Sequence, residues 1–216
     1  MEAVIRGTTI HDQAIVLTGH LQEERFSAND DGSGCASVLE IARALKRMID
    51  DGRIARPARD IRFWWVNEIS AEEQYLADHP DERRKVLVNI NQDMVGAKQS
   101  AGSRVQFVTR PPASRPSFLG DVVQSIVESL VEGNTAYLAA VQARQIRPGG
   151  DLASGGGAAT EEQSFSRPIF SRLGTRERYD ARIVPFHNNT DHQVFNMAPI
   201  GIPAVTFTNW PDDYIH

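Results

Sequence analysis

Three short apolar runs, each followed within three residues by a histidine or a carboxylate, constrain this sequence most strongly. Each run is rich in β-branched, aromatic or other apolar residues and has the length of a buried strand. Side chains that follow the strands of a parallel sheet meet at one edge of that sheet, where α/β proteins bind ligands. We therefore expect the polar residues after the runs to lie close together. The pairs are Ala14–Thr18 with His20, Ile61–Val66 with Glu68, and Val86–Ile90 with Asp93.

Helix-forming segments alternate with these strands. Between Cys35 and Ile49, apolar residues recur every three or four positions, which predicts an amphipathic helix packed on a sheet. Similar spacing occurs in Phe118–Val131, and Arg104–Thr109 and Pro203–Thr208 are two further strand candidates. This alternation predicts an α/β fold, in which helices cover both faces of a mixed, largely parallel central sheet.

Length and composition favour a single domain. A chain of 216 residues is long enough for one sizeable core, and its 41% hydrophobic and 24% charged residues are ordinary for a globular protein. We expect one domain over residues 1–216, lacking its terminal elements at both ends. Within it, a loop rich in glycine and serine is expected as an insertion at residues 147–178.

Charge and cysteine content exclude several classes of function. The formal net charge of -5 provides no basic surface for nucleic acid. No apolar run approaches the ~20 residues that a membrane span requires. The single cysteine, Cys35, excludes an internal disulfide and a cysteine-based zinc cluster. A metal site in this chain would therefore use histidine and carboxylate ligands.

Five residues form a candidate metal site. Each has a simpler explanation when it is taken alone, because an aspartate before a helix is usually a cap and a lone histidine is usually a hydrogen-bonded surface residue. Taken together, histidine and carboxylate ligands without cysteine are typical of a catalytic Zn²⁺ site that leaves positions open for water. The five candidates are His20, Asp30, Glu68, Asp93 and His216.

Six short motifs follow one another along nearly the whole chain. They are Gly19-His20, Ser27–Gly34 (SANDDGSG), Asn67-Glu68, Asn91–Gly96 (NQDMVG), Asp191-His192 and Gly201–Val205 (GIPAV). In type and order, this set resembles metallopeptidase family 28, the di-zinc aminopeptidase family that is related to the glutaminyl cyclases. The two most distinctive motifs are SANDDGSG, which opens a helix, and NQDMVG, which ends a strand.

The resemblance implies a site with two zinc ions, which Asp30 bridges. His20 and Glu68 complete one ligand set in this assignment. Asp93 and His216 complete the other. Two ions about 3.5–4 Å apart would polarise a scissile carbonyl and activate the attacking water. The implied substrate is a peptide with a free N-terminus, and the implied fold is the zinc-exopeptidase fold, also called phosphorylase/hydrolase-like, with a mixed eight-stranded sheet.

Two positions depart from the family pattern. The family has a Glu-Glu pair after the second strand, with the first glutamate as general base, whereas this chain has Asn67 before Glu68. An amide cannot accept a proton near neutral pH, and a general base contributes ~10²–10⁴-fold. Impaired activity is therefore expected unless Glu72 or Glu73 substitutes. The second departure is Gln22, where a family aspartate usually orients the first histidine.

Two further segments have two interpretations each. Asp191 and His192 match a family segment beside the metals, so we expect them next to the ligands or against the substrate, although a simple loop turn explains them equally well. Trp210 either lines a specificity pocket or belongs to a turn. Trp64 and Trp65 are expected to pack within the sheet.

Three functions are compatible with these residues. The first is an active zinc exopeptidase of the aminopeptidase type. The second is a zinc-binding pseudoenzyme or peptide-binding domain that has lost its base at Asn67. The third is glutaminyl cyclisation, which uses one zinc ion and also needs an acid at position 67. Because relatives of this family are commonly exported, we expect a secreted or periplasmic protein.

Overall fold

The computed structural model describes residues 1–21, 27–99, 105–145 and 178–210. Gln22, His216 and all but the last residue of the predicted insertion at 147–178 lie outside the described residues. Within the described ranges, seven strands form one sheet in the order β1-β3-β2-β4-β7-β5-β6. The strands are β1 (Glu2–Ile5), β2 (Ile10–His20), β3 (Arg59–Val66), β4 (Val86–Gln92), β5 (Gln106–Thr109), β6 (Ala181–Val184) and β7 (Ala204–Thr208).

The centre of the sheet is parallel. Strands β3, β2, β4 and β7 run in the same direction, each paired with its neighbour in that order. Strand β1 is antiparallel to β3 at one edge, and β5 is antiparallel to β7, with β6 parallel to β5 at the other edge. These pairings confirm the predicted mixed, largely parallel sheet, and they bring the C-terminal ends of β2, β3 and β4 to one side.

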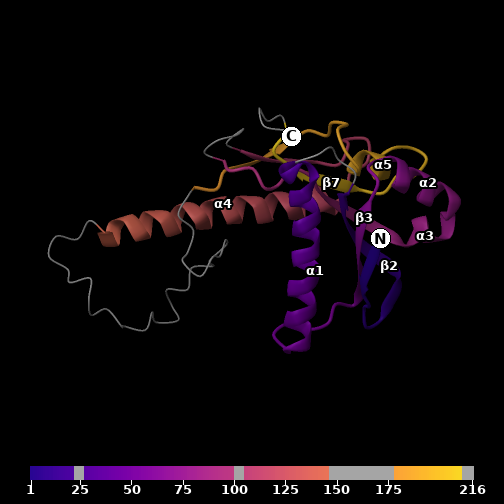
Figure 1. Cartoon of the computed structure of the whole chain (residues 1–216), viewed down its shortest axis with the longest axis horizontal. Helices are drawn as coiled ribbons and strands as arrows, with labels where there is room; N and C mark the ends of the chain where they lie inside the picture. Colours follow the sequence, from indigo (N-terminus) through magenta and orange to yellow (C-terminus); the bar gives the residue numbers. More distant parts are fainter. Residues whose placement is uncertain (22–26, 100–104, 146–177, 211–216) are drawn as a thin grey trace.

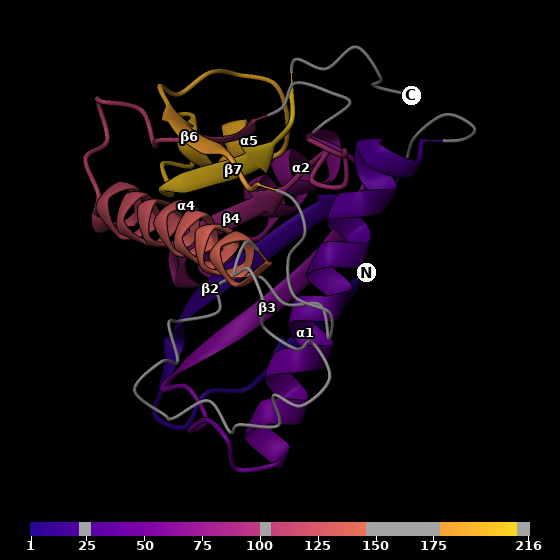
Figure 2. The same cartoon turned by 90° about the vertical axis from the view of Figure 1, so that its left-hand side faces the viewer.

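Helices cover both faces of the sheet (Figures 1 and 2). Helices α1 and α4 lie on one face, and α2, α3 and α5 lie on the other. The helical elements are a π-helical turn η1 (Ala28–Ser33), α1 (Gly34–Asp50), α2 (Ser70–Asp78), α3 (Pro80–Lys85), α4 (Phe118–Gln145) and α5 (His192–Asn196).

The central strands are buried on both faces, which explains their continuous apolar sequences. On β2, Leu17 packs with Val38 of α1 on one face. The adjacent residue Val16 points to the opposite face, where it belongs to the same core as Leu76 of α2 and Phe195 of α5. Burial on both faces holds β2 firmly in the middle of the sheet, so its last residue has a fixed position.

All five predicted strands and both predicted helices are present. Trp64 and Trp65 pack in cores on opposite faces of the sheet, as expected. Six shorter elements, β1, β6, η1, α2, α3 and α5, lie outside the segments that the sequence analysis predicts. None of the helices in the described ranges combines the length and the apolar character that a membrane crossing requires.

Candidate metal centre

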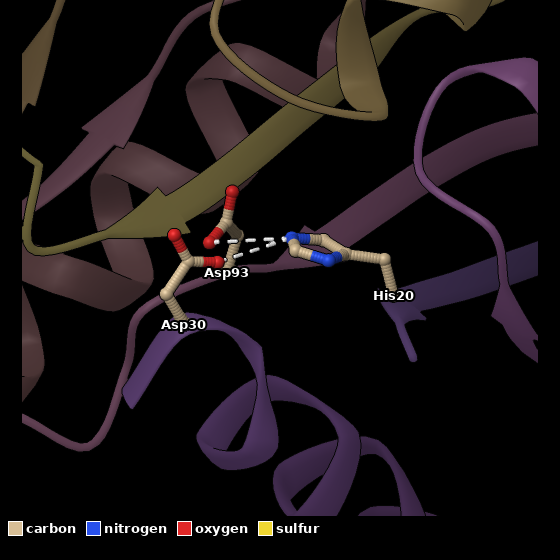
Figure 3. Close-up of side chains that lie close together, drawn as sticks. All are labelled: His20, Asp30 and Asp93. Carbon is tan, nitrogen blue, oxygen red and sulfur yellow. Dashed lines mark ion pairs between the residues drawn. The ribbon is translucent and has the colours of Figure 1, made fainter. Parts of the chain in front are cut away.

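A histidine and two aspartates converge where three segments of the fold meet (Figure 3). His20 ends β2, Asp93 follows β4, and Asp30 lies in η1, ahead of α1. The Nε2 atom of His20 lies 3.5 Å from Oδ1 of Asp30 and 3.7 Å from Oδ1 of Asp93. One ligand atom from each of the three residues lies within 4.8 Å of the others. The cluster is therefore compact enough for a single metal ion to contact all three residues.

Glu68 extends this cluster from the end of β3. Its Oε1 atom lies 4.0 Å from Nε2 of His20, and its side chain is 25% exposed. Four of the five predicted ligands therefore lie together, and the fifth, His216, lies outside the described residues. Three of the four lie at or just beyond the ends of β2, β3 and β4, the strands whose apolar runs end in polar residues.

The donor set fits the zinc that the sequence predicts. An imidazole nitrogen and carboxylate oxygens are ligands that Zn²⁺ takes in catalytic sites. Three carboxylates gathered around one histidine also repel one another, and a divalent cation between them offsets that repulsion. Both the chemistry and the charge of the cluster therefore suit a metal ion.

Asp31 joins the three segments that carry the ligands, and its side chain is buried. Its Oδ2 atom accepts a hydrogen bond from the backbone amide of His20 at 3.0 Å. Its Oδ1 atom accepts hydrogen bonds from the amides of Gly34 at 3.0 Å and Met94 at 3.2 Å. Asp31 thus caps α1, as expected of an aspartate before a helix, and it also fixes the ends of β2 and β4.

Two residues that directly follow candidate ligands have strained backbones. Ile69 has a φ of 60° and Met94 has a φ of 58°, which side chains other than glycine rarely adopt. In both cases a buried aspartate accepts the hydrogen bond of the strained amide, Asp191 for Ile69 at 2.7 Å and Asp31 for Met94 at 3.2 Å. These aspartates hold the two turns in the conformations that present the neighbouring carboxylates.

A buried polar network connects the strands behind the cluster. The side-chain oxygen of Asn91 on β4 accepts a hydrogen bond from Thr18 of β2 at 2.7 Å. The amide nitrogen of Asn91 donates to Thr190 and to Thr206 of β7, each at 3.2 Å. All four side chains are buried. Because buried polar groups are costly without partners, this network favours a single register of the central strands.

Burial and charge shift the pKa values of the site. The pKa of His20 rises to about 10, because hydrogen bonding and charge from Asp93 and other acids outweigh the burial that opposes its charge. Burial, with the charge of Asp93 adding to it, raises the pKa of Asp31 to about 8. Burial likewise raises the pKa of Asp191 to about 7. The metal-free cluster therefore holds protons that a bound cation would displace.

Asp191 and His192 lie beside the cluster. Both are fully buried, and the charge of His20 acts on Asp191 while the charge of Asp93 acts on His192. Burial, together with the charge of His187, lowers the pKa of His192 to about 4. His192 is therefore a neutral imidazole at neutral pH. This location agrees with the predicted place next to the ligands, and the roles of the two residues remain a prediction.

Asn67 occupies the position of the expected general base. Its side chain is exposed, and its Oδ1 atom accepts a hydrogen bond from the hydroxyl of Ser70 at 2.7 Å. The amide therefore joins the start of α2 to the end of β3 instead of contributing a proton acceptor to the cluster.

An aromatic cavity lies next to His192. Its volume is about 430 Å³, and Trp210 is 40% exposed at its wall. Phe186 and His187 also line it, with ring centroids 5.5 Å and 6.4 Å from that of His192. Trp210 therefore lines an open aromatic cavity, and its role in a specificity pocket remains a prediction.

Comparison with known proteins decides the family. The sequence model of Peptidase family M28 matches residues 3–137, which is more than half of the chain. The chain belongs to peptidase family M28. Aminopeptidase YwaD from Bacillus subtilis (strain 168) is 33% identical over 109 residues, which amount to 46% of this M28 chain and 22% of YwaD.

Solved structures share the fold of this M28 chain. BSAP, a zinc aminopeptidase from Bacillus subtilis, has a TM-score of 0.51 at 20% identity, over 96% of this chain and 38% of BSAP. A putative peptidase from Clostridium acetobutylicum has a TM-score of 0.57 at 17% identity, over 96% and 34% of the two chains. A glutaminyl cyclase from Macrostomum lignano has a TM-score of 0.55 at 14% identity, over 97% of this chain and 60% of the cyclase. The chain thus spans less than two thirds of each of these relatives.

Close packing at the start of α1 gives a direct test of the site's architecture. A Cβ atom added at Gly34 would lie 2.1 Å from the carbonyl oxygen of Gln92 and 2.2 Å from Oδ1 of Asp31. We expect Gly34→Ala to lower the free energy of unfolding by roughly 1–3 kcal/mol, the usual effect of overpacking. Chemical denaturation measures this change. Gly120→Ala is the matched control, because the nearest atom to its added Cβ is 3.5 Å away; equal stability losses in the two variants would contradict the prediction.

Proposed function

We propose that this M28 chain carries the catalytic centre of a zinc-dependent aminopeptidase that hydrolyses the N-terminal peptide bond of a peptide. The main support is the cluster of His20, Asp30 and Asp93, whose ligand atoms lie within 4.8 Å of one another at the C-terminal edge of the parallel strands. Membership of a peptidase family supports hydrolysis. The similarity to an aminopeptidase and to a zinc aminopeptidase supports the bond cleaved and the metal.

The proposed centre holds two zinc ions, bridged by Asp30. The distances support a ligand pairing that differs from the one the sequence suggests. His20 groups with Asp93 in the compact cluster, and Glu68 lies at its periphery, 4.0 Å from His20. We therefore assign His20 and Asp93 to one ion and Glu68 to the other, with His216 as the proposed partner of Glu68.

Bound zinc would polarise the scissile carbonyl and lower the pKa of the attacking water. The chain's own residues orient the reactants. Glu68 is the most exposed of the four ligand candidates at 25%, which suits it to meet the free amino group of a peptide. The aromatic cavity at Trp210 would accept an apolar first side chain, because it lies beside His192 and has a volume of about 430 Å³.

Zinc content and hydrolysis, measured on the same preparation, test this proposal. We expect two zinc ions per chain by elemental analysis. We also expect hydrolysis of aminoacyl-p-nitroanilides that a chelator abolishes and added zinc restores. A peptide with an N-terminal glutamine, assayed in parallel, separates hydrolysis from cyclisation, because a glutaminyl cyclase shares this fold. Protein without zinc, or turnover that chelation leaves unchanged, would contradict the proposal.

A further inference from the structure

We propose that the cavity between β1, β3 and α2 binds a small organic amine in its protonated form. The ammonium group would lie against Glu72, and the apolar body would lie against Trp64 and Tyr75. This site is separate from the proposed zinc centre, because none of the four described ligand candidates lines the cavity. The inference therefore goes beyond the proposed peptidase function and does not depend on it.

Regular backbone patterns bring the walls of this cavity together. Arg62, Trp64 and Val66 occupy alternate positions of β3, so their side chains leave the same face of the sheet. Ala71 and Tyr75 lie one helical turn apart on α2, so they share one side of that helix. The strand and the helix thus enclose a volume of about 280 Å³.

Glu72 also lines this cavity, and the fold leaves its buried carboxyl group without a partner. The residue is 1% exposed, and neither of its carboxylate oxygens accepts a hydrogen bond from another described residue. Asp60, a buried carboxylate on β3, accepts hydrogen bonds from Arg6 at 2.6 Å and from Gly7 at 2.8 Å. A buried carboxyl group without such donors is costly, so a donor bound in the cavity would stabilise Glu72.

The charges around the cavity favour a cation as that donor. Arg62 pairs with Glu2 at 2.5 Å and with Glu82 at 3.0 Å. The amino group of Met1, which also lines the cavity, donates to a backbone carbonyl oxygen at 2.8 Å. Both cations of the lining therefore have partners other than Glu72. An ammonium group in the cavity supplies the charge and the hydrogen bonds that this carboxylate lacks.

Aromatic rings indicate the kind of body that the amine carries. The ring centroids of Trp64 and Tyr75 are 5.5 Å apart, with an angle of 78° between the ring planes. Rings in this arrangement offer an apolar corner, and their faces attract cations. An apolar cavity of ~150 Å³ is large enough for benzene. The larger volume here therefore accommodates one aromatic ring with a short aminoalkyl arm, which makes an arylalkylamine the expected class of ligand.

Binding of the ammonium group should release a proton from Glu72. In the metal-free protein, burial raises the pKa of Glu72 to about 9, and the charge of Asp191 adds to this effect. A cation beside the carboxyl group lowers that pKa, so the group ionises as the amine binds. The charged and titratable groups around Glu72 are the amino group of Met1, Glu2, Arg62 and Tyr75 at the cavity, with His20, Glu68 and Asp191 acting through their charges.

Titration calorimetry on chelator-treated protein tests the site without a metal ion that could bind the amine. The probes are phenethylamine and 2-phenylethanol, which differ in having an ammonium or a hydroxyl group. We expect phenethylamine to bind the wild-type protein at least ~10-fold more tightly, the usual effect of a hydrogen bond to a charged group. Titrations in buffers with different ionisation enthalpies should show about one proton released per amine near neutral pH.

Substitutions in the first turn of α2 locate the bound amine. Glu72→Gln should remove both the preference for phenethylamine and the proton release, while the affinity for 2-phenylethanol stays within about twofold. Glu73→Gln, the same change at the exposed neighbour, should reproduce the wild-type values. Ala71→Leu places a larger side chain in the cavity and should weaken both probes. Thermal melting of each variant checks that it folds.

The outcomes separate a binding site from a structural carboxyl group. Phenethylamine that does not bind the wild-type protein, or a preference for it that persists in Glu72→Gln, would overturn the proposal. Equal losses of both probes in Glu72→Gln would assign this residue a structural role and overturn it as well. Nα-acetyl-lysine methylamide carries its ammonium group on a peptide side chain without an aromatic ring, so tighter binding of this probe would overturn the assignment to an arylalkylamine. None of these measurements requires zinc or turnover, so failure here leaves the proposed peptidase function untouched.

Discussion

Replacing Asp30 with alanine is expected to remove both zinc ions and to lower aminopeptidase turnover by about 10³-fold or more. The reason is its place at the centre of the cluster, with Oδ1 3.5 Å from Nε2 of His20. In the proposed centre, loss of the bridging carboxylate would remove one ligand from each ion and the negative charge between them, so the two cations would repel each other more strongly. Because the metal ions contribute several kcal/mol to stabilisation of the transition state, turnover should fall by several powers of ten.

Zinc stoichiometry by elemental analysis, together with p-nitroanilide turnover, measures the effect of Asp30→Ala. Asp50→Ala is the matched control, because Asp50 lies on α1 with its side chain 49% exposed and pairs with a lysine one helical turn away. The control should keep both zinc ions and full activity. Two zinc ions per chain in the Asp30 variant would contradict the assignment of Asp30 as the bridging ligand.

The fold was predictable to the extent that its elements are long and regularly patterned. Strands β2, β3 and β4 are apolar runs because both of their faces are buried, and α1 has the spacing of a helix packed on one side. The sequence of β6, Ala181–Val184, contains no comparable run, and most of its residues are partly exposed. The five-residue helix α5 is too short to show a helical period. Such elements form because neighbouring strands and helices stabilise them.

The positions of the ligand candidates followed from the sequence because each lies just beyond an apolar run or at the start of a helix. The ligand pairing that we propose from the distances differs from the one that the family resemblance implies. Strand β2 lies between β3 and β4, and its residues are in register with both, His20 opposite Val66 and Thr18 opposite Asn91. His20 can therefore approach a residue after either strand. The directions of the side chains, which no pattern in the sequence encodes, bring Asp93 into the compact cluster.

The supporting residues of the site were harder to find in the sequence. Glu72 and Glu73 are adjacent and chemically identical, yet one is buried and the other exposed. The difference arises from the packing of α2, whose Leu76 lies in the same core as Phe195 of α5, distant in the chain. Asp31 looks like an ordinary helix cap, and its bonds to the ends of two strands become visible only in three dimensions. Tertiary contacts thus decide which of several similar carboxylates are buried.

The metal-free protein is expected to lose stability as the pH rises from 6.5 to 9. The pKa of Glu72 is raised from 4.5 to about 9, and that of Asp191 from 3.8 to about 7. A folded-state pKa above the unfolded value means that the folded protein binds the proton more tightly. The stabilisation that this tighter proton binding gives the folded state is therefore complete below pH ~4. It is lost as the pH rises through the folded-state pKa. His20, with a pKa raised from 6.5 to about 10, changes stability in the same direction.

Between pH 6.5 and 9, no buried group of the described residues acts against this trend. The pKa of His192 is lowered from 6.5 to about 4, so its effect on stability is confined to pH values below 6.5. Across the range from 6.5 to 9, we expect the melting temperature of the chelator-treated protein to fall by roughly 5–10 °C, since ~1 kcal/mol corresponds to ~2–4 °C in a chain of this size. Differential scanning calorimetry at several pH values measures this change.

Two comparisons connect the pH dependence with particular groups. In Glu72→Gln the fall should be shallower, because an amide does not ionise, whereas Glu73→Gln should reproduce the wild-type slope. With zinc bound, the slope should become flatter or reverse, because metal binding displaces protons from its ligands and strengthens as the pH rises. A melting temperature that is constant or increases with pH in the metal-free wild type would show that the buried carboxyl groups are ionised at neutral pH. Their proton affinity would then have no part in the stability of this site.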